Sequence, residues 1–90
     1  LLAMKSEQLA AMKDDASMRL EELEELLAEK SEKLEKTARR AFAKDMSNMA
    51  KWGKKVDKLL AKDPLSAEAR GLLYRILLKE AEIRRLLKLI

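Results

Sequence analysis

Residues 59–72 read LLAKDPLSAEARGL, and this stretch decides the fold. Pro64 disfavours helical backbone at the residue before it, so a helix arriving from the N-terminal side ends near Lys62. Asp63 and Ser66 are residue types that cap the start of a helix. The sequence therefore predicts a turn at 63–66 and a last helix that runs from Ser66 towards the end of the chain.

The composition of the whole chain is that of an all-helical protein. Its 90 residues include 2 Gly and 1 Pro, whereas 48% are hydrophobic and 40% are charged. So few turn-forming residues exclude a β-sandwich or a β-barrel. Apolar residues recur at helical spacing from Leu2 to Leu59. We therefore predict an all-α fold, a small antiparallel helical bundle in which residues 1–90 form one domain.

A second turn is needed within the first 62 residues. One helix over that length would be ~90 Å long, and the last helix could not cover it. Similar helix lengths favour a first turn near 29–33, which gives three helices. Capping and helix-dipole arguments favour an alternative near 14–17, where aspartate and serine precede a run of glutamates. We prefer 29–33, because helices of matched length cover one another's apolar faces.

Charge is distributed along the chain in two blocks. Residues 14–35 contain nine acidic and three basic side chains, a net charge of −6, and residues 36–62 contain nine basic and two acidic ones, a net charge of +7. We expect these blocks to lie antiparallel and to attract each other, which favours the correct pairing of helices. The basic stripe within 36–62 also offers a minor alternative function, electrostatic binding of an acidic partner.

Several function classes are excluded by the residue types that are missing. The chain has 0 Cys and 0 His, which removes the usual nucleophile, general base and transition-metal ligands. We expect no enzymatic activity, no cofactor, no metal and no small-molecule substrate. The net charge of +4 is too small to indicate a nucleic-acid partner. No targeting or membrane-spanning segment is apparent, so we expect a soluble protein suited to cytoplasmic recombinant expression, without a membrane partner.

The last helix is apolar on more than one side. Leu73, Ile76 and Ile83 share one stripe, but further apolar residues lie outside it. A helix that is apolar nearly all round is buried nearly all round, and a bundle of three helices leaves no helix in that position. We therefore predict a protein-binding face on this helix. Its expected buried centre is Tyr74, Leu77, Leu78 and Ala81, and its expected charged rim includes Arg70 and Arg85.

The first helix carries a weaker second face. Met4, Ala11 and Met18 are spaced seven residues apart and lie away from the main apolar stripe. Methionine adapts to irregular surfaces and is common at binding faces, so we predict that these residues make secondary contacts. Gly53 and Gly71 also interrupt helices, and residues that break the local rules often mark functional positions.

The whole chain resembles de novo designed helical miniproteins of the kind made as protein binders. The resemblance lies in the glutamate-rich surface LEELEELL at 20–27, the tight connection KDPLS at 62–66 and the absence of Cys and His. It implies a module that presents a helix face to another protein. The alternative is a designed homo-oligomer or coiled-coil scaffold, in which the same faces close on copies of the chain by self-association.

Overall fold

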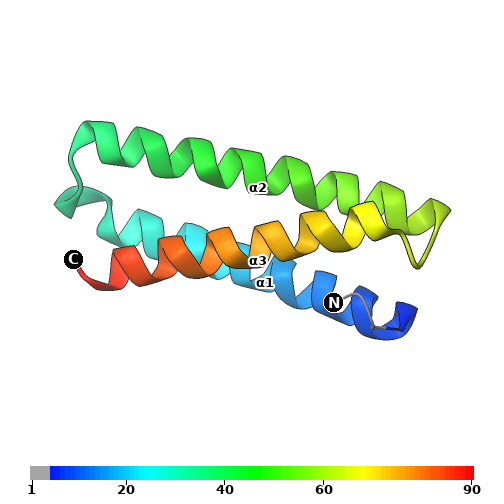
Figure 1. Ribbon diagram of the computed structural model, residues 1–90. Helices are drawn as coiled ribbons and strands as arrows, with labels where there is room; N and C mark the ends of the chain where they lie inside the picture. The colour runs from blue at the N-terminus through cyan, green and yellow to red at the C-terminus, as the bar shows by residue number, and fades with distance from the viewer. Residues whose placement is uncertain (1–4) are drawn as a thin grey trace.

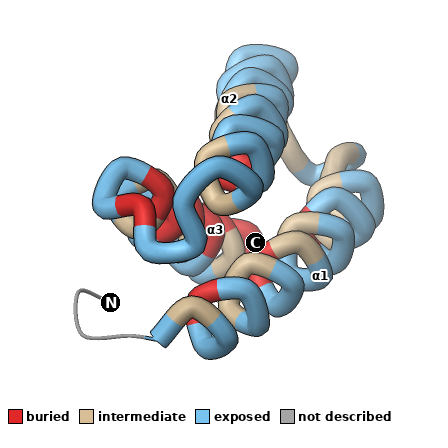
Figure 2. The backbone as a smooth tube through the Cα atoms, turned by 90° about the vertical axis from the view of Figure 1, so that its right-hand side faces the viewer, coloured by how far each residue is buried: buried red, intermediate tan, exposed pale blue. Residues whose placement is uncertain are grey.

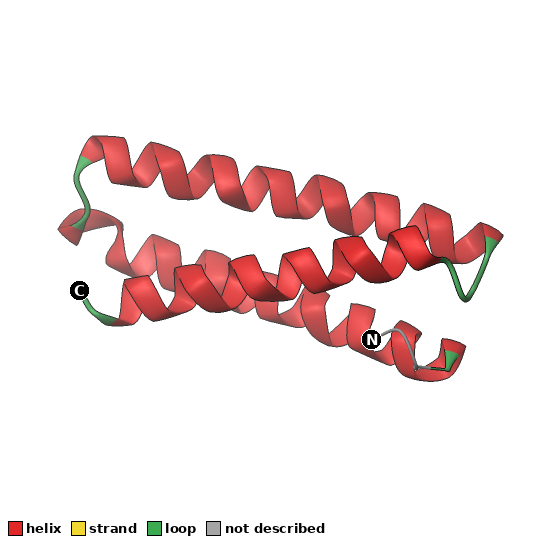
Figure 3. Ribbon diagram, viewed as in Figure 1, coloured by secondary structure: helices red, strands yellow, loops and turns green. Residues whose placement is uncertain are grey.

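The chain folds into three helices joined by two short connections. The computed structural model describes residues 5–90: α1 (Ser6–Lys30), a 3₁₀ turn η1 (Ser31–Lys33), α2 (Lys36–Lys62) and α3 (Ala67–Lys88). No strand occurs in this part of the chain (Figure 3). Consecutive helices are antiparallel, so α1 and α3 run in the same direction (Figure 1). The predicted all-α fold of three packed helices is confirmed.

The second connection forms as the sequence predicts. α2 ends at Lys62, and the Asp63 carboxylate accepts a hydrogen bond from the backbone N–H of Leu65 at 3.0 Å. The Ser66 hydroxyl, which is buried, accepts a bond from the N–H of Ala69 at 3.1 Å. Asp63 therefore stabilises the turn, whereas Ser66 is the cap that starts α3.

The first connection follows the preferred prediction of 29–33. α1 tightens into the 3₁₀ turn at Ser31, whose hydroxyl donates to the Ala28 carbonyl at 2.9 Å, and Leu34 then adopts extended backbone. The alternative break at 14–17 is wrong. α1 continues through it, because Ala16 is buried against the core and Asp15 pairs with Arg19 one turn later at 2.8 Å.

The core consists of two clusters that share α3. Figure 2 shows the buried positions on the sides of the helices that face each other. Trp52 and Leu20 are partly buried and pack against both clusters, so they join them. One cluster contains Leu9, Ala16, Val56, Ala69, Leu73 and Ile76, and the other contains Leu23, Met46, Met49, Ile83 and Leu87. Each fully buried large side chain stabilises the fold by roughly 1.5–3 kcal/mol relative to an exposed one.

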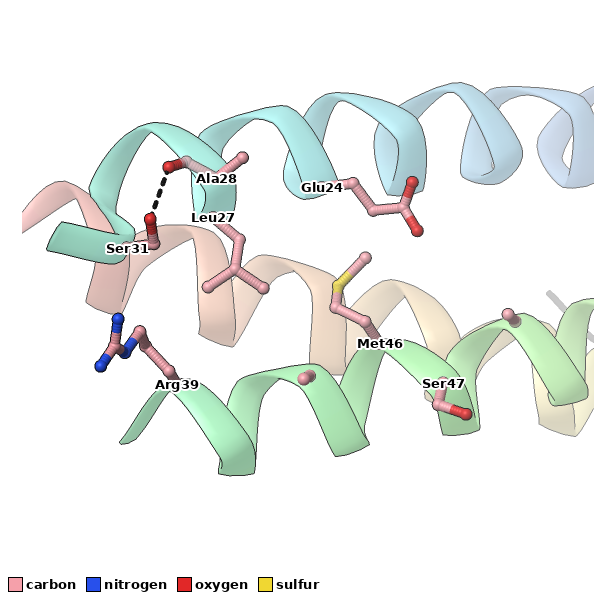
Figure 4. Close-up of a pocket in the computed structure, with 9 residues that line it drawn as sticks. Glu24, Leu27, Ala28, Ser31, Arg39, Met46 and Ser47 are labelled. Carbon is pink, nitrogen blue, oxygen red and sulfur yellow. Dashed lines mark hydrogen bonds between the residues drawn. The ribbon is translucent and has the colours of Figure 1, made fainter. Parts of the chain in front are cut away.

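The three helices do not pack equally closely against one another. α3 packs against both other helices more extensively than they pack against each other. A cavity of about 480 Å³ lies between α1 and α2, and Leu27 of α1 points into it above Met46 of α2 (Figure 4). A second cavity of about 220 Å³ adjoins it, since Ala50 lines both. We call these two neighbouring cavities together the α1–α2 groove.

The two charge blocks lie antiparallel, as expected, but they do not form direct ion pairs. Within residues 5–90, the one ion pair between α1 and α2 joins Lys13 to Asp57 at 3.2 Å. The signs in this pair are opposite to those of the two charge blocks, because the basic side chain comes from α1. The groove holds the acidic wall of α1 and the basic wall of α2 apart.

Arg84, which pairs with a buried carboxylate of its own helix, links α3 to α1. Glu80 is 2% exposed, and its carboxylate accepts a 2.7 Å hydrogen bond from Arg84 one turn later. Arg84 also donates to the Arg19 carbonyl and to Glu22, both at 3.3 Å. The bond to Glu80 raises the pKa of the Arg84 guanidinium above its ordinary value, so this side chain stays charged wherever the protein is folded. The network fixes the register of α3 against α1.

Replacement of Arg84 by Met should destabilise the bundle by about 2 kcal/mol. The substitution keeps the apolar stem but leaves the Glu80 carboxylate buried without its cation. Glu80→Leu, which removes the buried charge itself, should change stability by less than about 1 kcal/mol. Guanidinium unfolding of both variants measures the difference. Equal losses of stability in the two variants would contradict this role of the Glu80–Arg84 pair.

Candidate protein-binding face

The side of α3 that faces away from the core carries an unusual set of large apolar side chains. Tyr74 and Leu78 are each 53% exposed, although both lie in the middle of a helix. They are four residues apart and so occupy neighbouring turns of one face. We call this surface the α3 outer face; its exposed residues are Gly71, Tyr74, Leu78, Ala81, Glu82, Arg85, Leu86 and Leu89.

The flanks of α3 are held by polar contacts to its neighbours. On the α2 side, the Arg75 guanidinium lies over the Trp52 ring at 5.3 Å from its centroid, and Lys79 approaches Asp45 at 3.8 Å. On the α1 side, Arg84 makes the network described above. These contacts fix the rotation of α3 about its own axis. The direction in which Tyr74 and Leu78 point is therefore set by the bundle.

The structure brings together most of the predicted centre. Tyr74, Leu78 and Ala81 are exposed on the α3 outer face, and the predicted rim residue Arg85 lies beside them. Leu77 is different. It is half-buried and packs against the core cluster around Leu73, so it supports this face from its edge and does not form its centre. The other predicted rim residue, Arg70, is partly buried as well.

The predicted secondary contacts on α1 lie apart from this face. Met18 is 60% exposed and Ala11 is also exposed. Met18 follows the buried Ala16 by two residues, or about 200° around the helix, so it faces away from the bundle. Met4 lies outside the described residues. The structure therefore does not unite the α1 and α3 predictions into one surface.

Two apolar residues near the end of α3 belong to this face, although neither is among the predicted site residues. Leu86 is exposed, and Leu89, just after the helix, is 78% exposed. The spacing from Leu78 to Leu89 is eleven residues, close to three helical turns, so periodicity places them on one line. Periodicity does not place Leu86 on this line, because Leu86 lies between the buried stripe of α3 and the line through Leu78 and Leu89.

The basic stripe of α2 has no apolar surface of its own to offer. Its long side chains are exposed, but Trp52 beside them is partly buried in the core and covered by Arg75.

No helix in the described part of the chain is long and apolar enough to cross a membrane. Residues 5–90 also contain no group of three or more acidic residues placed to hold a metal ion.

Comparison with protein-family models, curated proteins and solved structures found no match to this chain.

Gly71→Ala should stabilise the protein by about 0.5–1 kcal/mol. Gly71 has helical backbone on the α3 outer face, and a Cβ added there meets nothing within 4 Å. Alanine gains helix propensity without a clash in the free protein. Thermal or denaturant unfolding measures the gain. A loss of stability would contradict the open environment described for this position.

Proposed function

We propose that this chain is a non-catalytic protein-binding module, in the manner of a designed helical binder, which docks its α3 outer face onto another protein. The proposal is carried by Tyr74 and Leu78, two large apolar side chains half exposed on a helix whose other side forms the core. Contiguous exposed apolar surface on a small protein is typical of an interaction site. The absence of Cys and His supports the non-catalytic part of the proposal.

The chemistry of the face suits a protein partner. Tyrosine buries a large area at a small cost in side-chain entropy, and its hydroxyl can bond to a partner. Arg85 and Glu82 are exposed on the same face, between Leu78 and the leucines at 86 and 89, and supply charged groups for a partner. Tyrosine and arginine are both enriched in protein interfaces.

Substitution of Leu78 by Asp should weaken binding of a protein partner by at least about thirtyfold, because a charge would be buried at the centre of the interface. Helicity by circular dichroism should be unchanged and the free energy of unfolding should fall by less than about 1 kcal/mol, since Leu78 lies outside the core. Partners are selected with the unmodified protein on a protein array, and their affinities for the variant are then measured.

Leu65→Asp is the matched control. Leu65 is 54% exposed, almost the same as Leu78, but it lies in the turn between α2 and α3. It should bind every selected partner as the unmodified protein does. Equal binding by Leu78→Asp and the unmodified protein would rule out the α3 outer face, and unfolding of Leu78→Asp would show that Leu78 belongs to the core.

A further inference from the structure

The α1–α2 groove is a second surface, separate from the α3 outer face. Leu27 and Met46 give its larger cavity an apolar lining, and its α2 wall carries the small exposed side chains of Ala43 and Ala50. It extends along both helices, since the two adjoining cavities together reach from Ser31 at one end to the Lys13–Asp57 ion pair at the other. The groove therefore offers a helix-length surface.

The walls of the groove carry opposite charges that are not paired with each other. Glu24 on α1 lines the larger cavity and Lys54 on α2 lines the smaller one. Glu21 and Lys51 lie beside them near the two rims, and all four side chains are exposed. Among the described residues, none of the four takes part in an ion pair. Away from the Lys13–Asp57 pair, where the signs are reversed, an occupant that matches these walls must be basic over α1 and acidic over α2.

A second copy of this chain has that charge pattern. We propose that two copies associate groove to groove, related by a two-fold axis that runs along the groove. This axis places α1 of one copy over α2 of the other, so Glu21 of each copy lies near the height of Lys51 of the other, and an acidic and a basic side chain meet twice. A two-fold axis across the groove would instead place α1 over α1, with like charges opposed. The charge pattern therefore selects one arrangement.

The chosen axis also matches side chains in height and size. The Lys13–Asp57 pair sets the register of α1 against α2, so Leu27 lies level with Ala43. Rotation about an axis parallel to the helices keeps each residue at its height. Leu27 of one copy then lies over the small Ala43 of the other, and the partner's Leu27 fills the equivalent position. Each copy thus places a large side chain at the height of a small one of the other copy.

The dimensions of the bundle allow an interface of the size found in specific dimers. The bundle measures 42 × 18 × 16 Å, so one long face offers at most about 750 Å² per copy. The total of about 1,500 Å² lies within the range of about 1,200–2,000 Å² for stable protein interfaces. α3 lies behind the groove in each copy, so the dimer leaves both α3 outer faces exposed on opposite sides.

Light scattering behind a sizing column, from micromolar to millimolar protein, tests this proposal. The mass should rise from 10.3 kDa towards twice that value. In 1 M salt the midpoint should move to a concentration at least about tenfold higher, because exposed charges are then screened within about 3 Å. A constant mass of 10.3 kDa over the whole range would overturn the proposal, and so would a dimer unaffected by salt.

Charge reversal of each wall identifies the face. Glu21→Lys with Glu24→Lys makes both walls of the groove predominantly basic, and Lys51→Glu with Lys54→Glu makes both walls predominantly acidic. Each variant alone should be monomeric, because like charges oppose, and an equimolar mixture should recover a heterodimer. Dimers of either variant alone that match the unmodified protein in strength would overturn the proposal.

Leu78→Asp separates this interface from the α3 outer face. This variant should dimerise as the unmodified protein does, since Leu78 lies outside the groove. Loss of the dimer in Leu78→Asp would place the contact on α3 and refute the groove interface. The dimer and the proposed binding of another protein can therefore fail independently.

Discussion

The buried stripe of α3 is the packing surface on which the rest of the structure depends. Ala69, Leu73 and Ile76 belong to one core cluster, and Ile83 and Leu87 belong to the other. Both α1 and α2 contribute to each cluster, but they meet each other less than they meet α3. α3 therefore holds the two longer helices together by burial of apolar surface, the largest favourable contribution to folding.

This arrangement determines which surfaces remain open. Because α3 packs against two helices with one side, its other side is left with Tyr74 and Leu78 exposed. Because α1 and α2 are joined mainly through α3, the space between them remains a groove. One packing surface thus explains both the candidate binding face and the groove with unpaired charges. The Glu80–Arg84 network fixes the height of α3, and so the position of both surfaces.

Much of the fold could be predicted because strong local signals coincide with its boundaries. At the second turn, the ring of Pro64 disfavours continuation of α2, and the hydroxyl of Ser66 caps the start of α3. The first turn has no such residue, so helix length decided between the two possible positions. The position at 29–33 is correct, whereas the alternative at 14–17 contains Ala16, which is part of the core. Glu80 was missed, since a charged residue on the core stripe is tolerated only when tertiary structure supplies its partners.

The candidate site was predictable only in part, for a reason of geometry. Residues far from the core stripe, such as Tyr74 and Leu78, are exposed at any reasonable packing angle. Leu77 lies near the boundary of the stripe, and its burial depends on how closely α1 approaches. The groove depends on the separation of α1 and α2, which no pattern within one helix specifies.

Native-state amide hydrogen exchange tests most directly whether α3 holds the bundle together. The account predicts that the amides of Leu73, Ile76 and Ile83 exchange only when the whole protein unfolds, with the same opening free energy as the most protected amides of α1 and α2. If α3 opened at a lower free energy while α1 and α2 stayed protected, the two longer helices would be stable without it. That result would contradict the central role of the α3 stripe.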